Sequence, residues 1–149
     1  MNLPDALKDF QLQTMNVVHR SLLLVSGGRI GRRLGNMPVY KVTTTGRTSG
    51  QPRTVMLTSP VQDGDTIVFI ASKGGDDRDP DWYRNLVANP TITLEAVGGD
   101  GAAAFVARTA SAEEKAELWP KVVAAYKGYA GYQRKTDRDI PVVLAEPAG

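Results

Sequence analysis

From Val39 onward, apolar residues alternate with polar ones, and this period of two limits the chain to a mainly β fold. Short segments rich in Val, Ile, Thr and Tyr follow one another, separated by turn residues. The short links between them favour antiparallel hairpins. Six strands are predicted, over residues 39–45, 53–59, 66–72, 91–97, 102–109 and 140–145. Antiparallel strands in this number favour a small barrel, because closure removes the exposed edges of the sheet.

Helices are predicted on either side of these strands. Residues 4–25 carry apolar side chains at spacings of three to five, which is typical of an amphipathic helix. Residues 80–89 predict a short helix with a proline in its first turn. Ser111 and Glu114 form a capping box, which indicates a third helix that runs to about Ala125. The predicted class is therefore α+β, mainly β with flanking helices.

Composition excludes several kinds of active site. The chain has 149 residues, no cysteine and one histidine, His19. Without cysteine there is no disulfide, no thiolate nucleophile and no cysteine-ligated metal. A single histidine leaves no HExxH zinc motif, and we expect no metal site. Any difficult chemistry would therefore come from a bound cofactor.

Charge is unevenly distributed along the chain. Residues 1–53 hold eight basic and two acidic residues, a balance of +6, whereas the remainder holds ten basic and fourteen acidic residues, a balance of −4. A basic N-terminal third suits an anionic ligand or an anionic surface. The whole chain carries only +2 and has no repeated basic–aromatic pairs, so we expect no nucleic-acid partner.

Residues 1–35 are predicted to form an amphipathic helix and a basic segment ahead of a barrel domain over 36–149. Arg29, Arg32 and Arg33 follow the helix, and this order is typical of a helix that lies on an anionic membrane. A helix docked on its own domain or on a partner subunit explains the same pattern and leaves an oligomer open. No apolar run is long enough to span a bilayer, and the start lacks the order of a signal peptide. We expect a cytoplasmic protein, with peripheral contact to the inner face of the cell membrane as the finer hypothesis.

Residues 43–53 (TTTGRTSGQPR) supply a candidate anion-binding loop between two predicted strands. Gly46 and Gly50 free the backbone, the hydroxyl groups donate hydrogen bonds, and Arg47 and Arg53 carry fixed positive charge. This set suits a phosphate or a carboxylate. It is not a Walker A loop, because no Lys-Ser/Thr pair follows the second glycine and a strand comes next. An ordinary polar hairpin turn is the alternative.

Two further segments carry candidate site residues. Residues 70–75 (IASKGG) leave an apolar strand with a hydroxyl, an ammonium and two glycines, which suits the rim of a ligand site. Tyr126, Tyr129 and Tyr132 recur every three residues, so on a helical segment they share one face and line a pocket for a flat ring. Core packing with solvated hydroxyl groups is the alternative for the tyrosines.

Taken together, these segments resemble one family. The motifs occur in a fixed order between about Leu34 and Pro147: TTTGRTSGQPR, ASKGG, DPDWYRNL, ANP, Trp119-Pro120, the three tyrosines and TDRDIPVV. They are similar to the deazaflavin-dependent nitroreductase and quinone reductase family of actinobacteria, which uses reduced coenzyme F420. The resemblance implies a split β-barrel like that of the FMN-binding relatives of pyridoxamine oxidase, in agreement with the six predicted strands.

The resemblance also implies roles for individual residues. Those expected to hold the phosphate and glutamyl tail of the coenzyme lie on the hairpin loop: Arg47, Thr48, Ser49 and Arg53. Those expected beside the deazaflavin ring lie on two strands: Thr54, Val55, Met56, Leu57, Ile70, Ala71, Ser72 and Lys73. Those expected to close over the cofactor or touch its ring are aromatic or polar: Trp82, Tyr83, Asn85 and Tyr129. The expected substrate-lining residues are Tyr126, Tyr132 and Thr58, and the predicted catalytic residues are Ser72 and Tyr129.

The implied reaction is hydride transfer from reduced F420 to a quinone such as menaquinone, or to a similar flat electrophile. Two departures from the family pattern bear on it. Position 48 is Thr where the family often has Lys or Arg, which loosens the tail contact. Position 58 is Thr where the prodrug-activating member has Tyr, which speaks against nitroimidazole reduction more than against quinone reduction. The alternatives are the same barrel with FMN, a non-catalytic carrier of a deazaflavin, tetrapyrrole or lipid, and a peripheral membrane module without a ring ligand.

Overall fold

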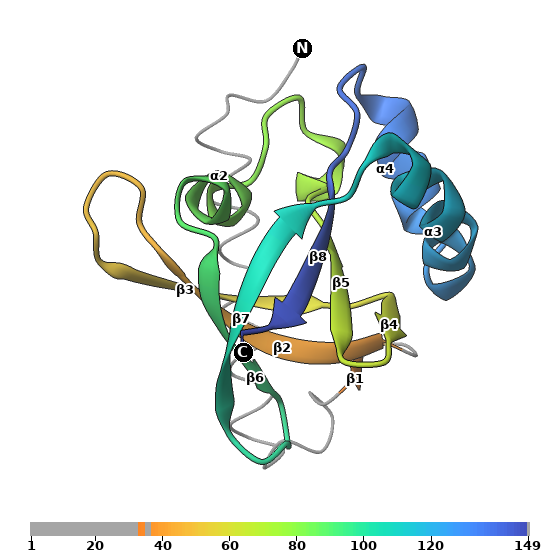
Figure 1. The fold of residues 1–149 in the computed structure, drawn as a ribbon. Coiled ribbons are helices and arrows are strands. Elements are labelled where there is room, and N and C mark those ends of the chain that lie inside the picture. Colours follow the sequence, from red (N-terminus) through yellow and green to blue (C-terminus); the bar gives the residue numbers. More distant parts are fainter. Residues whose placement is uncertain (1–32, 35–36, 149) are drawn as a thin grey trace.

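The computed structural model describes residues 33–34 and 37–148 (Figure 1). The predicted helix over residues 4–25 lies outside the described residues, as do Arg29 and Arg32. The division of the chain at residue 35 therefore stays a prediction. Within the described residues, no helix is long and apolar enough to cross a membrane.

Eight strands form one antiparallel sheet in the described part of the chain. In chain order they are β1 (Arg33–Leu34), β2 (Met37–Thr45), β3 (Pro52–Thr58), β4 (Val61–Asp63), β5 (Thr66–Ile70), β6 (Thr91–Ala96), β7 (Ala102–Thr109) and β8 (Val142–Pro147). Hydrogen-bonded neighbours run β1-β2-β6-β7-β8-β5-β4, and β3 pairs with the other edge of β2. The six predicted segments are all strands, but the predicted number is too low, because β1 and β4 are too short to show a period of two.

Ser59 and Pro60 join β3, which pairs with β2, to β4 at the other end of the sheet. β3 pairs with β2, whereas β4, which follows after a two-residue break, pairs with β5. At the break, the backbone N–H of Ser59 donates to the carbonyl of Pro38, and its hydroxyl lies 2.5 Å from the carbonyl oxygen of Val68. Ser59 is fully buried. The sheet therefore curls back on itself through one bent segment, as the barrel prediction requires.

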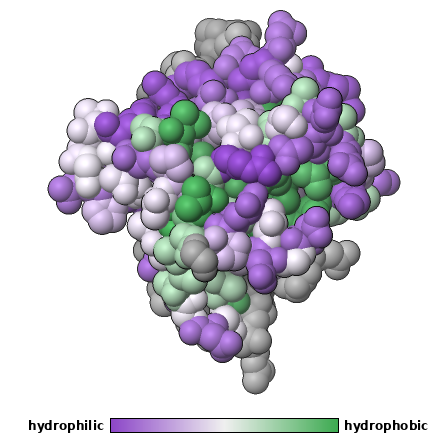
Figure 2. All heavy atoms as spheres, in the orientation of Figure 1, coloured by the Kyte–Doolittle hydropathy of each residue, from purple (hydrophilic) through white to green (hydrophobic). Residues whose placement is uncertain are grey.

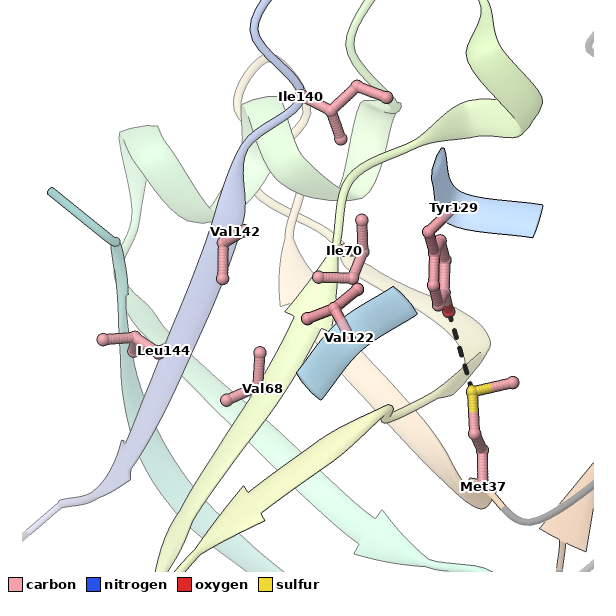
Figure 3. Packing of buried hydrophobic residues seen from close by; sticks show 8 residues of the cluster. All are labelled: Met37, Val68, Ile70, Val122, Tyr129, Ile140, Val142 and Leu144. Atoms are coloured by element: carbon pink, nitrogen blue, oxygen red, sulfur yellow. Dashed lines mark hydrogen bonds between the residues drawn. The ribbon is translucent and has the colours of Figure 1, made fainter. Parts of the chain in front are cut away.

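Apolar side chains pack on both faces of the curled sheet. Along β8, Val142 and Leu144 belong to one buried cluster, whereas Val143 and Ala145 belong to another. The first cluster, shown in Figure 3, also contains Val122 of α3 and Tyr129 of α4. The second contains Leu86 of α2. A strand buried on both faces needs an unbroken apolar run, and that explains the VVLA sequence of β8.

Three α-helices and a short 3₁₀ turn occur in the described residues: η1 (Lys73–Gly75), α2 (Asp81–Ala88), α3 (Ala112–Ala125) and α4 (Gly128–Lys135). Ser111 caps α3 as predicted, because its hydroxyl accepts from the N–H of Glu114 and the Glu114 carboxylate accepts from the N–H of Ser111. Helix α4 was not predicted, since its glycines and mixed polarity weaken a helical pattern. α3 and α4 lie together on one side of the sheet, and α2 lies near the β2–β3 hairpin (Figure 1).

Polar residues cover most of the face shown in Figure 2, with apolar side chains in limited areas between them. Among the described large hydrophobic residues, the exposed ones are Val87, Val106 and Tyr126. Of these, only Tyr126 belongs to the predicted site.

Candidate active site

The hairpin loop between β2 and β3 is tied to helix α2. The N–H of Gly46 donates to the carbonyl of Gln51, and the N–H of Gly50 donates to that of Gly46, so the loop has a defined shape. Arg47 donates to the side-chain oxygen of Asn85 twice, from its backbone N–H at 3.1 Å and from Nη1 at 2.7 Å. The other nitrogen, Nη2, lies 3.2 Å from the Asp81 carboxylate. Asn85 is buried, so α2 and the loop form one unit.

The remaining side chains of this loop face solvent. Thr48, Ser49 and Arg53 are exposed, and the Ser49 hydroxyl accepts from Arg53 Nη2 at 3.2 Å and from the N–H of Gln51 at 3.2 Å. Ser49 therefore fixes both the loop backbone and one guanidinium. This exposed loop therefore offers an anion a guanidinium, two hydroxyl groups and a backbone of fixed conformation, which are the donors that such a ligand requires.

Strand β3 presents two different faces. Val55 and Leu57 pack against the second apolar cluster, and the alternation of a strand places Thr54, Met56 and Thr58 on the opposite face. Thr54 is exposed, whereas Met56 and Thr58 are half-buried. The strand thus runs from the hairpin loop at Pro52 to Thr58, about 20 Å at the usual rise for its seven residues.

The three tyrosines cluster at the far end of β3. Tyr129 lies 5.2 Å from Tyr126 and 6.1 Å from Tyr132 between ring centroids, and each pair is close to perpendicular. The hydroxyl groups of Tyr126 and Tyr132 are 3.3 Å apart. The Tyr129 hydroxyl is 3.4 Å from that of Thr58 and 4.0 Å from Met37 Sδ, the second contact being drawn in Figure 3. These contacts attach β3 to the cluster.

The tyrosines do not share one helix face, and that prediction is wrong. Tyr126 has extended backbone angles at the C-terminus of α3, whereas Tyr129 and Tyr132 lie on α4. The rings still meet because the Tyr126 ring folds over Gly128: a Cβ at position 128 would lie 2.4 Å from it. The chain reversal between two helices, rather than helical spacing, assembles the cluster.

The hydroxyl groups of Tyr129 and Tyr132 stay protonated at neutral pH. Burial raises the pKa of Tyr129, while its hydrogen bond with Thr58 acts in the opposite direction. The hydrogen bond with Tyr126, together with burial, raises the pKa of Tyr132 to about 12. Both residues therefore remain hydrogen-bond donors over the whole physiological range.

The end of β5 leads into a left-handed turn. Ile70 and Ala71 are buried, while Ser72 and Lys73 are half-buried. Lys73, Gly74 and Gly75 have φ values of 46°, 63° and 84°, and among the described residues Lys73 alone combines a side chain with positive φ. A non-glycine residue in this region is strained and occurs preferentially at functional sites. The turn packs on α4, where a Cβ at position 75 would lie 2.9 Å from the carbonyl oxygen of Tyr132.

Trp82 and Tyr83 lie on α2 and pack against the second apolar cluster. Their rings are perpendicular at 6.4 Å, and the Tyr83 hydroxyl is 2.8 Å from that of Thr109 at the end of β7. Both side chains are half-buried, so they brace α2 against the sheet while keeping part of each ring accessible.

The predicted site residues thus fall into two groups joined by β3. The first group consists of the hairpin loop and α2. The second consists of the three tyrosines, Thr58 and the turn after β5, which packs on α4. Sequence reasoning missed Arg138, which donates to the main chain on both sides of the turn, and Met37, which contacts Tyr129. Arg138 lies in the TDRDIPVV motif, but no local spacing relates it to residues 71–76. No group of three or more metal-ligating side chains occurs in the described chain.

Comparison with known proteins identifies the family of this chain. The family model described as F420H(2)-dependent quinone reductase matches residues 17–147. The chain belongs to this family. The quinone reductase Rv1261c of Mycobacterium tuberculosis, named as F420H(2)-dependent, is 38% identical over 131 residues, which cover 85% of this chain and 86% of that protein. The assignment confirms the predicted family, and with it the predicted enzyme class and coenzyme.

Two solved structures are similar to this member of the quinone reductase family. The F420-H2 dependent reductase FDR-A is 43% identical, covers 73% of this chain and 94% of its own, and superposes with a TM-score of 0.65. A structure described as a domain-swapped dimer is 38% identical, covers 90% of this chain and 99% of its own, and has a TM-score of 0.66. Together with the curled antiparallel sheet, these similarities confirm the predicted split-barrel fold.

Proposed function

We propose that this quinone reductase family member transfers a hydride from reduced F420 to a quinone or a similar flat electrophile, with the coenzyme extended along β3. The observation that carries the proposal is the position of β3, which starts at an exposed loop of anion-binding character and ends at the tyrosine cluster. Bound F420 would supply the hydride. The chain itself binds the coenzyme, orients the two rings and limits access of water.

The anionic tail would lie on the hairpin loop. Arg53, held by Ser49, is an accessible cation there, and the hydroxyl groups of Thr48 and Ser49 are exposed beside it. Arg47 is engaged by Asn85 and Asp81, so it contributes charge from a fixed position. With Thr at position 48, the loop depends on these two guanidinium groups for its fixed charge.

The deazaflavin ring would lie between the strand residues Thr54–Leu57 and the segment 70–73. Ile70 and Ala71 are buried and give this side a rigid wall, while Ser72 and Lys73 are half-buried and accessible. Trp82, Tyr83 and Asn85 would close the site from α2. Of these, Asn85 acts through the loop, since its side chain is fully engaged with Arg47 and Thr44.

The quinone would bind at the tyrosine cluster, with Tyr126 and Tyr132 as walls and Thr58 at the end of β3. Negative charge develops on a quinone oxygen as the hydride arrives, and a positioned hydroxyl donor stabilises it. Tyr129, whose pKa is raised, and Ser72 are the proposed donors. Thr58 holds the Tyr129 hydroxyl at 3.4 Å and so orients it.

Single-turnover oxidation of reduced F420 by menaquinone tests these roles. Tyr129→Phe and Ser72→Ala are expected to lower the rate about tenfold to a hundredfold each, as the loss of a positioned donor does, with little change in coenzyme affinity. Thr66→Val, which removes a hydroxyl at the start of β5 outside the proposed site, is the control and should keep the rate. A variant at position 72 or 129 with the wild-type rate is not catalytic.

Two finer points complete the proposal. Similarity to a domain-swapped dimer supports an oligomer, which light scattering of the purified chain would detect.

Residues 1–35 would hold the protein against the membrane that contains the quinone. Replacing Arg29 and Arg32 with Gln should then slow the reduction of lipid-dissolved menaquinone and spare a water-soluble quinone. An equal effect on both substrates would exclude the membrane role.

A further inference from the structure

We propose that Arg138 is a positioning residue for the coenzyme site: its guanidinium holds the left-handed turn at residues 72–76 in the geometry that presents Ser72 and Lys73. This inference rests on the proposed function, since it concerns the segment placed beside the deazaflavin ring. Nothing in the local sequence connects Arg138 with the turn.

Arg138 contacts the main chain on both sides of the turn. Nη2 donates to the carbonyls of Ala71 at 3.1 Å and Ser72 at 2.9 Å, and Nε donates to the carbonyl of Asp76 at 2.8 Å. Nη1 pairs with the Asp79 carboxylate at 3.0 Å. One planar group therefore satisfies three carbonyl oxygens and one carboxylate that are separated in sequence.

These contacts enclose the strained part of the backbone. Lys73, at φ 46°, lies between the carbonyls of Ser72 and Asp76, to both of which Arg138 donates. Such a conformation persists only where the surrounding structure over-determines it. On the other side, Gly75 packs against α4 with no room for a side chain. Arg138 and α4 thus hold the turn between them.

Arg138 is itself well anchored. Its side chain is only 15% exposed, and its carbonyl accepts from Gln133 Nε2 of α4 at 2.7 Å. The Thr136 hydroxyl, two residues earlier, donates to the Asp77 carboxylate at 2.7 Å. A lysine would retain the charge but not the fork of donors, because a single ammonium cannot reach acceptors on both sides of the turn in one plane.

Arg138→Ala and Arg138→Lys test the inference against Arg108→Ala as the matched control. The Arg108 guanidinium also bonds to side chains from two other elements, Glu114 and Glu146, but not to the turn. We expect both Arg138 variants to weaken F420 binding and to slow the oxidation of reduced F420 by at least about tenfold, since small misplacements of reacting groups have large effects. Arg108→Ala should lower the thermal midpoint while binding and rate stay within about twofold of wild type.

Chemical rescue separates positioning from general destabilisation. Guanidinium ion at non-denaturing concentration should restore part of the activity of Arg138→Ala and leave that of Arg108→Ala unchanged. If Arg138→Ala fails to fold, Arg138→Lys carries the comparison of binding and rate. Binding and turnover in the Arg138 variants equal to those of Arg108→Ala would overturn the inference. Failure of the proposed function itself would look different, since Ser72→Ala would then also leave the turnover of reduced F420 unchanged.

Discussion

At the scale of single residues, helix α2 places a carboxylate beside the candidate anion-binding loop, where it competes with an anionic ligand. The Asp81 carboxylate lies 3.2 Å from Arg47 Nη2, on the guanidinium that the coenzyme tail is proposed to approach. Asp81 is exposed, so water and salt screen this pair, and its contribution is modest. Asn85 fixes Arg47 independently, and the guanidinium keeps its place without Asp81.

Asp81→Asn is therefore expected to tighten F420 binding about twofold to fivefold at low ionic strength, because one repulsive charge is removed from the tail site. The gain should vanish at high salt and should be absent for a deazaflavin without the phosphate and glutamyl tail. Asp65→Asn, in the distant β4–β5 turn, changes the net charge equally and serves as control. Equal effects of the two substitutions would show that only overall charge matters.

The hydroxyl groups of Tyr129 and Tyr132 give the site a characteristic pH response. Folding raises both pKa values, that of Tyr132 to about 12, so the folded state favours the protonated form. The associated stability is complete below about pH 10, the unfolded value, and is lost as the pH rises through the folded values. In an ultraviolet titration at least two of the five tyrosines should ionise late in the folded protein. Titration of all five near pH 10 would contradict the buried cluster.

At the scale of elements, η1 packs against α4, and this contact joins the proposed coenzyme side of the site to the proposed substrate side. Gly75 has φ 84° and lies 2.9 Å, measured from an added Cβ, from the Tyr132 carbonyl oxygen. Gly74, at φ 63°, has no atom within 4 Å of such a Cβ. The two neighbours differ in packing and share a left-handed backbone.

Gly75→Ala should accordingly destabilise the fold by about 2–4 kcal/mol, from a left-handed alanine and a steric clash together, and should displace α4 from the turn. Gly74→Ala should lose only the conformational part, about 1–2 kcal/mol. Urea unfolding midpoints of the two variants measure the difference. Equal losses would mean that the helix does not pack on the turn as described.

Local pattern predicted the elements better than it predicted their contacts. Alternation located six strands, and the Ser111–Glu114 pair located the start of α3, because both signals reside in neighbouring residues. β4 was missed because three residues cannot show a period, and the position of Tyr126 was misjudged because a chain reversal mimics helical spacing. Arg138 acts on residues more than sixty positions away, which no local pattern encodes.

At the scale of the whole molecule, the chain leaves its redox chemistry to a coenzyme, and β3 is the strand along which we propose that the coenzyme binds. Two of the basic residues that make the N-terminal third positive, Arg47 and Arg53, lie at one end of β3. The neutral tyrosine cluster lies at the other end. The curl of the sheet at Ser59 brings the second end beneath α4. In the proposed binding mode, β3 thereby fixes the distance between the site of the anionic tail and the site of the ring.

F420-dependent reduction of a quinone by this chain is tested most directly by the recovery of oxidised-F420 absorbance after the purified protein is mixed with reduced F420 and menaquinone. We predict a rate that depends on both protein and quinone and that falls when Arg53 is replaced by Gln. With reduced FMN in place of reduced F420, followed by the absorbance of oxidised FMN, we predict no protein-dependent oxidation. Quinone-independent recovery, or equal turnover with reduced FMN, would contradict the account.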